Sequence, residues 1–334
     1  MSTPRVATEL PPELILDILS SSSRSTLLRT SLVSRTWRGP SQATLESHLS
    51  LPTQKIARAW LKCPNRRVRT RRLSLGAGLT EQEYEQVFET VDGLEELALV
   101  ADVASSKAKV DARALQSKQL TGLRCLYLNA PLLAPTTETL SLQFSLEVLS
   151  CKGLYRSFPR AILISIVAAS HKSLTTLDLD CYGSNASAAT SISSLQPLSG
   201  SVTSLELHGS DRQTPALLSF LSSSSSLTTL TCWEATLPLL AACPPSLKHL
   251  SIGKNYIFHS DQAYFDLLSG SGLLRQLSGI HFGGISSATL RAQIGGIELL
   301  RECEERGIDV QFGVEVSGRY GTFGWPMLGG KICL

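Results

Sequence analysis

The sequence predicts an α/β solenoid in which short strands alternate with helical connectors. The first observation is a pattern, Leu-x-x-Leu-x-Leu, whose copies begin at Leu94, Leu123, Leu174, Val202 and Leu247. The second is that the expected strand centres lie 20 to 30 residues apart, and the third is that helix-start signals fall between them. Such a period indicates stacked units, each too small to bury its own apolar face. Stacking leaves an open surface for binding, which favours a receptor over an enzyme.

Ten strands are expected, each centred on one aliphatic residue: Leu73, Leu97, Leu126, Leu149, Leu177, Leu205, Leu230, Leu250, Ile280 and Val310. Because side chains alternate faces along a strand, the leucines of each copy point inward, where each contributes about 1.5 to 3 kcal/mol. A strand, a loop and a helix in every unit are typical of a leucine-rich-repeat horseshoe, which we predict over residues 51–312. Residues 313–334 are glycine-rich with three aromatic residues, and they are expected to form a tail or an end cap.

Helix signals fall between these strands. Thr80 and Glu83 have the spacing of a capping box, and an apolar helical face follows them, formed by Tyr84, Val87, Phe88 and Val91. Pro159 and Pro215 stand where further helices are expected to begin. A last helix is expected to stop at Gly307, before a closing strand.

The first fifty residues follow a different pattern and predict three short helices. The first begins at Pro11 or Pro12, because proline is favoured in a first helical turn. The second spans roughly residues 24–36, and the third opens at Pro40 and runs toward Leu49. Apolar pairs four residues apart give the first helix a stripe wider than so small a bundle can hide. Some of this surface is therefore expected to meet a partner.

These residues resemble the F-box family over about residues 8–50. The resemblance rests on an opening Leu-Pro-x-Glu-Leu, an apolar residue one turn later and a Leu-Val-x-Arg-x-Trp stretch, which here are Leu10, Pro11, Glu13, Leu14, Ile18, Leu32, Val33, Arg35 and Trp37. It implies that the N-terminal helices dock a Skp-type adaptor and, through it, a cullin. The residues that it assigns to the adaptor contact are Leu10, Pro11, Leu14, Ile18, Leu32, Val33 and Trp37.

The resemblance further implies a non-catalytic substrate-recognition subunit of an SCF (Skp-cullin-F-box) E3 ubiquitin ligase. Such a subunit needs no active site and no cofactor, and its repeats bind a target protein that the sequence does not name. Two other classes stay open. One is a leucine-rich-repeat scaffold or inhibitor whose N-terminal helices only cap the solenoid, and the other is an enzyme with a non-repeat α/β fold and a deep polar pocket.

Charge is unevenly distributed, although the net charge is only +3. Residues 47–80 hold eight Lys or Arg and no acid, whereas residues 81–102 hold eight acids and no base. Adjacent blocks of opposite sign are expected to face each other. The basic block could bind nucleic acid or an import receptor through Arg66, Arg67, Arg69, Arg71 and Arg72. No aromatic residues interleave with these arginines for base stacking, so solvated strand flanks are the favoured interpretation.

Catalytic and metal-binding motifs are missing from the sequence. It contains no G-x-S-x-G, H-E-x-x-H or G-x-G-x-x-G, and its six histidines form no metal pair by spacing. Eight cysteines form no C-x-x-C pair, and Cys151 and Cys232 stand at leucine positions, which predicts buried thiols and a reducing, intracellular compartment. With no leader or membrane-spanning run indicated, we expect a cytoplasmic or nuclear protein that does not contact membranes.

A candidate target-binding patch follows from the strand pattern. Residues between and beside the leucines should project from the concave face of the sheet, and these are Tyr127, Asn129, Asp178, Asp180, Glu206, His208, Trp233, His249 and His281. If neighbouring strands stack about 4.8 Å apart, Asp180, His208 and Trp233 fall in one column. Trp233 is the sharpest candidate, because tryptophan dominates binding hot spots. The alternative is that polar residues are ordinary on an exposed sheet face.

Overall fold

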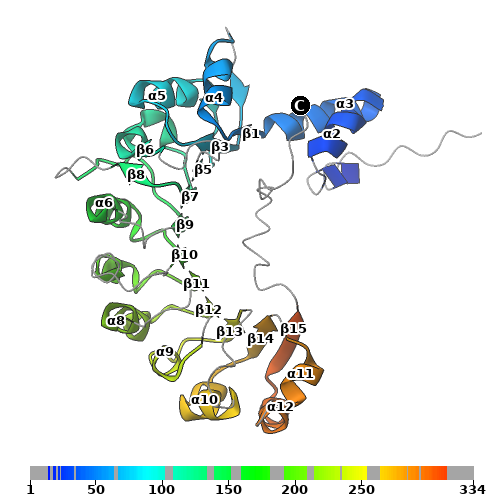
Figure 1. The fold of residues 1–334 in the computed structure, drawn as a ribbon, viewed down its shortest axis with the longest axis vertical. Helices are drawn as coiled ribbons and strands as arrows, with labels where there is room; N and C mark the ends of the chain where they lie inside the picture. The colour runs from blue at the N-terminus through cyan, green and yellow to red at the C-terminus, as the bar shows by residue number, and fades with distance from the viewer. Residues whose placement is uncertain are drawn as a thin grey trace, which may run out of the picture.

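The leucine copies form the strands of one large, open, parallel sheet in the computed structural model of this chain. The structure describes residues 14–15, 18–19, 22, 24–33, 35–63, 67–101, 108–133, 139–151, 159–180, 192–208, 214–233, 235–253, 264–283, 285–292 and 295–313. Within them, the sheet contains eleven strands in chain order: β1 (His48–Leu51), β3 (Arg72–Gly76), β5 (Glu96–Val100), β7 (Cys125–Asn129), β9 (Val148–Cys151), β10 (Thr176–Asp180), β11 (Ser204–His208), β12 (Thr229–Cys232), β13 (His249–Ile252), β14 (Gly279–Gly283) and β15 (Asp309–Gly313). Figure 1 shows that these strands follow the inner side of an arc.

Helices connect the strands and lie on the outer side of the arc (Figure 1). In chain order they are α4 (Gln54–Leu61), α5 (Glu81–Glu89), α6 (Arg160–Ser170), α8 (Pro215–Ser223), α9 (Leu237–Ala241), α10 (Tyr264–Gly270), α11 (Ser287–Arg291) and α12 (Gly296–Glu305). Short 3-10 turns complete several connections: η1 (Ala112–Gln116), η2 (Lys118–Leu120), η4 (Gln196–Leu198) and η5 (Leu273–Arg275). Two small parallel pairs flank the sheet, β2 (Val68–Arg69) with β4 (Val91–Asp92) and β6 (Val110–Asp111) with β8 (Leu132–Leu133). None of the described helices is long and apolar enough to cross a membrane.

The strand register places all ten predicted strand centres in one row. Each centre pairs with the next along the sheet, from Leu73 with Leu97 to Ile280 with Val310. These leucines are core residues as predicted: Leu97, Leu177 and Leu205 are fully buried within one apolar cluster that runs from Leu51 to Ile308. The stacking of leucine on leucine therefore sets the register of the whole sheet.

Strand β1 was not predicted, and its position corrects the expectation that a helix runs toward Leu49. Leu49 instead pairs with Leu73, so the row of strand centres begins one unit earlier. The carbonyl oxygen of Ser47 accepts hydrogen bonds from the backbone N–H groups of Arg71 (3.1 Å) and Arg72 (3.0 Å). These partners lie far along the chain, which is why a local pattern could not reveal the strand.

The oppositely charged blocks face each other, as predicted. Arg58 pairs with Glu83 at 2.6 Å, while Arg71 pairs with Glu95 and Arg72 with Glu96, both at 2.8 Å. Each pair joins one stacked unit to the next. Because most of these side chains remain partly exposed, their contribution lies more in alignment than in stability.

The helix starts and the helix stop predicted between the strands are confirmed, whereas Val91, which was expected on the helical face that follows Thr80, lies in β4 instead. Thr80 and Glu83 form the capping box of α5, Pro159 is the N-cap of α6, and Pro215 is the first residue of α8. After α12, Gly307 has a φ of +68°, a left-handed conformation that favours glycine.

Thr80→Ala is expected to lower the free energy of unfolding by about 1 kcal/mol, because the Thr80 hydroxyl accepts the Glu83 N–H at 3.2 Å. Urea denaturation followed by circular dichroism measures this change. Thr236→Ala is the matched control, since Thr236 is the N-cap of α9 but makes no capping hydrogen bond with its side chain. An equal loss in both variants would contradict the role assigned to the capping box.

Candidate functional site

The N-terminal helices divide their apolar residues between a small core and the surface. Ile15, Leu19 and Leu27 are buried together, whereas Leu14 and Ile18 are 49% and 48% exposed. Leu32, on α2 (Arg24–Val33), is 86% exposed. The wide stripe inferred from the sequence therefore has an inner half that packs within the helices and an outer half that faces solvent.

Trp37 belongs to α3 (Arg35–Glu46) and packs, half-buried, against this small core. It thus supports the helices themselves, although the resemblance assigned it to the adaptor contact. Of the other residues in that assignment, Leu10, Pro11 and the side chain of Val33 lie outside the described residues.

The boundary between α2 and α3 differs from the prediction. The second helix was expected to reach about residue 36 and the third to open at Pro40, but α2 ends at Val33 and Pro40 lies inside α3. Tertiary contacts explain the difference: the hydroxyl groups of Thr30 on α2 and Ser41 on α3 lie 2.9 Å apart, and Ser41 is fully buried. Packing of α3 along α2 outweighs the hydrogen bond that proline cannot make.

Residues 7–45 match the family model described as F-box-like. This F-box-like domain includes α2 and nearly all of α3, and it agrees with the N-terminal resemblance. No curated protein matches the chain. The family match covers the N-terminal helices alone, so the nature of the sheet that follows rests on its own geometry.

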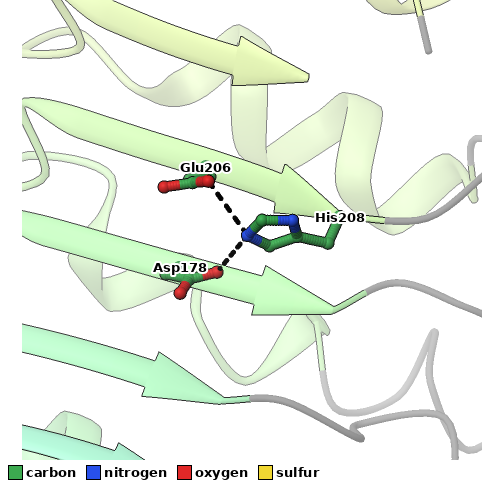
Figure 2. Close-up of side chains that lie close together, drawn as sticks. All are labelled: Asp178, Glu206 and His208. Carbon is green, nitrogen blue, oxygen red and sulfur yellow. Dashed lines mark ion pairs between the residues drawn. The ribbon is translucent and has the colours of Figure 1, made fainter. Parts of the chain in front are cut away.

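Asp178, Glu206 and His208 meet near the middle of the sheet, on adjacent strands β10 and β11 (Figure 2). Asp178 and Glu206 are direct register partners, and His208 lies two residues beyond Glu206 on the same face. The Nε2 atom of His208 lies 3.0 Å from Asp178 Oδ1 and 3.0 Å from Glu206 Oε1. We refer to these three residues as the β10–β11 triad.

Neighbouring side chains hold the triad in place. Ser150 on β9 donates a hydrogen bond of 2.6 Å to the other carboxylate oxygen of Asp178. On the opposite side, the ring of Trp233 lies 5.7 Å from the ring of His208, centroid to centroid, and is tilted by 55°. The imidazole therefore has a defined orientation toward the carboxylates.

Burial and charge act in opposite directions on the pKa of His208. Desolvation lowers this pKa, but hydrogen bonds and charge interactions with Asp178 and Glu206 outweigh it and raise the pKa to about 9. Both carboxylate residues are only 8% exposed. The triad is thus a mostly buried, polar cluster in which the two carboxylates stabilise a positive charge between them.

The backbone register pairs Asp180 with His208. Leu207 pairs with Cys232, so Trp233, the next residue, follows the strand beside His208. The backbone positions of the predicted column are therefore confirmed. The His208 ring, however, contacts Asp178 and Glu206 in the adjacent row. The side chain of Asp180 lies outside the described residues. Asp178 and Glu206 were predicted to project from the concave face as part of a binding patch, but both are buried, with 8% of each exposed.

The other candidate residues are spread along the same sheet. Tyr127 on β7 is half-buried, and burial raises the pKa of its hydroxyl. Asn129, at the end of β7, is exposed. On β13 and β14, His249 is exposed, and His281 is half-buried with its Nδ1 atom 3.0 Å from the hydroxyl of Ser251. Burial lowers the pKa of His281. These residues do not join the triad.

Sequence reasoning missed Ser150 as a partner of Asp178 and missed that one histidine faces two carboxylates. A signal was available: Ser150, Asp178 and Glu206 each directly follow the strand centre of their unit. Aligning the units by their strand centres would have placed the three side chains in one row.

Proposed function

We propose that this chain is a non-catalytic substrate-recognition subunit of an SCF-type E3 ubiquitin ligase. The F-box-like domain docks a Skp-type adaptor and, through it, a cullin. The sheet that follows is a leucine-rich-repeat solenoid that presents a target protein. The main support for this proposal is the match of residues 7–45 to the F-box-like family.

Exposed apolar residues support adaptor docking. Leu14, Ile18 and Leu32 remain in solvent although the neighbouring Ile15, Leu19 and Leu27 are buried. Several large apolar side chains exposed on one small domain are typical of a protein interface. Docking would bury them.

The repeating geometry supports the solenoid. One aliphatic residue per unit falls in a single register row from β1 to β15, and parallel strands of this kind need a crossover in each unit. Along β5 to β13, no helix of the described residues lies on the inner side of the arc (Figure 1). An open parallel face of this kind suits the binding of another polypeptide.

On this proposal the chain accelerates transfer by proximity. Ubiquitin transfer occurs elsewhere in the assembly, and the receptor raises the effective concentration of its target. No residue of this chain takes part in bond making.

The Leu14→Asp, Ile18→Asp double variant tests the docking. The amount of Skp-type adaptor that it retains is expected to be at least about ten-fold lower than for the unchanged chain, because docking would bury two carboxylates in an apolar interface. Co-expression and co-purification of the two proteins measure the retention. These positions are better probes than Trp37, whose truncation would also disturb the small N-terminal core.

Ile297→Asp is the matched control, because Ile297 is 60% exposed on α12 and the substitution makes the same chemical change. Leu32→Asp provides a second, independent probe if the double variant loses helicity by circular dichroism. Undiminished adaptor retention in folded variants at both places would refute the docking.

Deletion of residues 1–45 separates the proposal from the alternative of a scaffold or inhibitor that recruits no ligase. The cut leaves β1 intact, because β1 begins at His48. In a pull-down from native extract, the deletion is expected to lose the adaptor and cullin while it retains the target. A full-length chain that captures neither adaptor nor cullin favours the scaffold.

A further inference from the structure

We propose that the β10–β11 triad of Asp178, Glu206 and His208 is a binding site for one divalent transition-metal ion of the Zn²⁺ type. The site does not depend on adaptor docking. It lies on the sheet, far along the chain from the F-box-like domain, and it uses residues that the docking does not involve.

The donor atoms already converge on one point. One imidazole nitrogen and two carboxylate oxygens, one from each of three residues, lie within 4.8 Å of one another. Around a tetrahedral Zn²⁺, with ligand distances of about 2.0–2.1 Å, donor atoms are separated by about 3.3 Å. The two nitrogen-to-oxygen distances are 3.0 Å, so small side-chain movements would admit the ion (Figure 2).

A divalent metal ion can satisfy the two carboxylates around His208 more fully than a proton on the imidazole can. The Nε2 atom of His208 carries at most one hydrogen and lies 3.0 Å from one oxygen of each carboxylate, so that hydrogen cannot form a linear hydrogen bond to both. A divalent ion in the same place binds both carboxylates and the neutral imidazole at once. It also brings two positive charges to two buried carboxylates, whereas a protonated imidazole brings one.

The surroundings resemble the outer shell of a metal centre. Ser150 donates to the oxygen of Asp178 that does not face His208, which orients the carboxylate. Trp233 lies against the imidazole ring and restricts its rotation. Strand backbones rather than loops carry all three donors, which gives the rigidity that a preorganised site requires.

The donor types select the class of ion. An imidazole together with carboxylates suits Zn²⁺ and its first-row neighbours, whereas Ca²⁺ and Mg²⁺ prefer oxygen donors alone. Three protein donors leave at least one coordination position for water or another ligand.

Titration of the tag-free, full-length chain with ZnCl₂, after treatment with EDTA and its removal, tests the site by calorimetry. We expect saturable uptake of one equivalent and a rise in melting temperature that EDTA reverses. His208→Gln and Asp178→Asn are each expected to weaken binding by at least about 100-fold, because the first removes the imidazole nitrogen and the second removes the carboxylate charge. His281→Gln is the matched control, a half-buried histidine on the same sheet, and it is expected to bind like the unchanged chain.

Cobalt distinguishes the triad from the thiols, since Cys63 is free and exposed. The absorption spectrum of the Co²⁺-loaded chain is expected to show nitrogen and oxygen ligation without thiolate charge-transfer bands. This readout uses the unchanged chain, so it holds even if a triad variant fails to fold, and Glu206→Gln offers a third variant. Absence of saturable Zn²⁺ uptake, thiolate bands, or full affinity in the folded triad variants would each overturn the proposal. Adaptor retention measured on the same samples reports separately on the proposed ligase role.

Discussion

Leu205→Ala is expected to lower the free energy of unfolding by about 3 kcal/mol. Leu205 is fully buried on β11, between its register partners Leu177 on β10 and Leu230 on β12. Truncation removes the favourable transfer of the side chain from water and leaves a cavity. The flanking strands cannot close this cavity, because each is held in the sheet by its own neighbours. Urea denaturation followed by circular dichroism measures the loss.

Leu133→Ala is the matched control for this prediction, because the same change is made where the side chain is 51% exposed. It is expected to cost less than about 1 kcal/mol. Similar losses in the two variants would mean that the row of strand centres is not the main source of stability.

Gly76→Ala is expected to destabilise the chain by about 3 kcal/mol, because β3 passes against the backbone of Pro52 at this residue. A Cβ atom on residue 76 would lie 2.7 Å from the carbonyl carbon of Pro52 and closer still to its oxygen. Neither backbone can move easily, since Leu75 and Leu51 are paired in the sheet and Tyr84 donates a buried hydrogen bond of 3.1 Å to the Gly76 carbonyl. The entropy that alanine removes from the unfolded chain, about 0.4–1 kcal/mol, is too small to compensate.

Gly200→Ala provides the control, since a Cβ atom at residue 200 would meet no atom within 4 Å. It is expected to be neutral or to stabilise the chain by up to about 1 kcal/mol in the same denaturation experiment. A neutral result for Gly76→Ala as well would contradict the close approach of β3 to Pro52.

The predictable part of the fold is the part that repeats. The spacing of Leu97, Leu126 and the other strand centres can be read directly from the sequence. Because side chains alternate faces along a strand, these residues form a single buried row. Local signals were equally sufficient for the α5 capping box and for the glycine after α12, because those contacts lie within a few residues.

Features that depend on distant partners were not predictable in the same way. Strand β1 forms because Leu49 pairs with Leu73 on β3. Helix α3 continues through Pro40 because Ser41 packs against Thr30 on α2. In each case contacts made across the fold outweighed the local preference of the chain.

The sequence by itself predicted the F-box-like N-terminus through its resemblance to that family, and the stack of parallel strands through the spacing of apolar residues along the chain. Only the tertiary structure decided which of those residues face outward and where the polar ones meet. Leu14 and Ile15 are adjacent in sequence, yet one is exposed and the other buried. His208 contacts Asp178, thirty residues earlier, because parallel strands bring successive units within hydrogen-bonding distance. The conformation of the His208 side chain then directs its ring toward Asp178 rather than toward its register partner, Asp180.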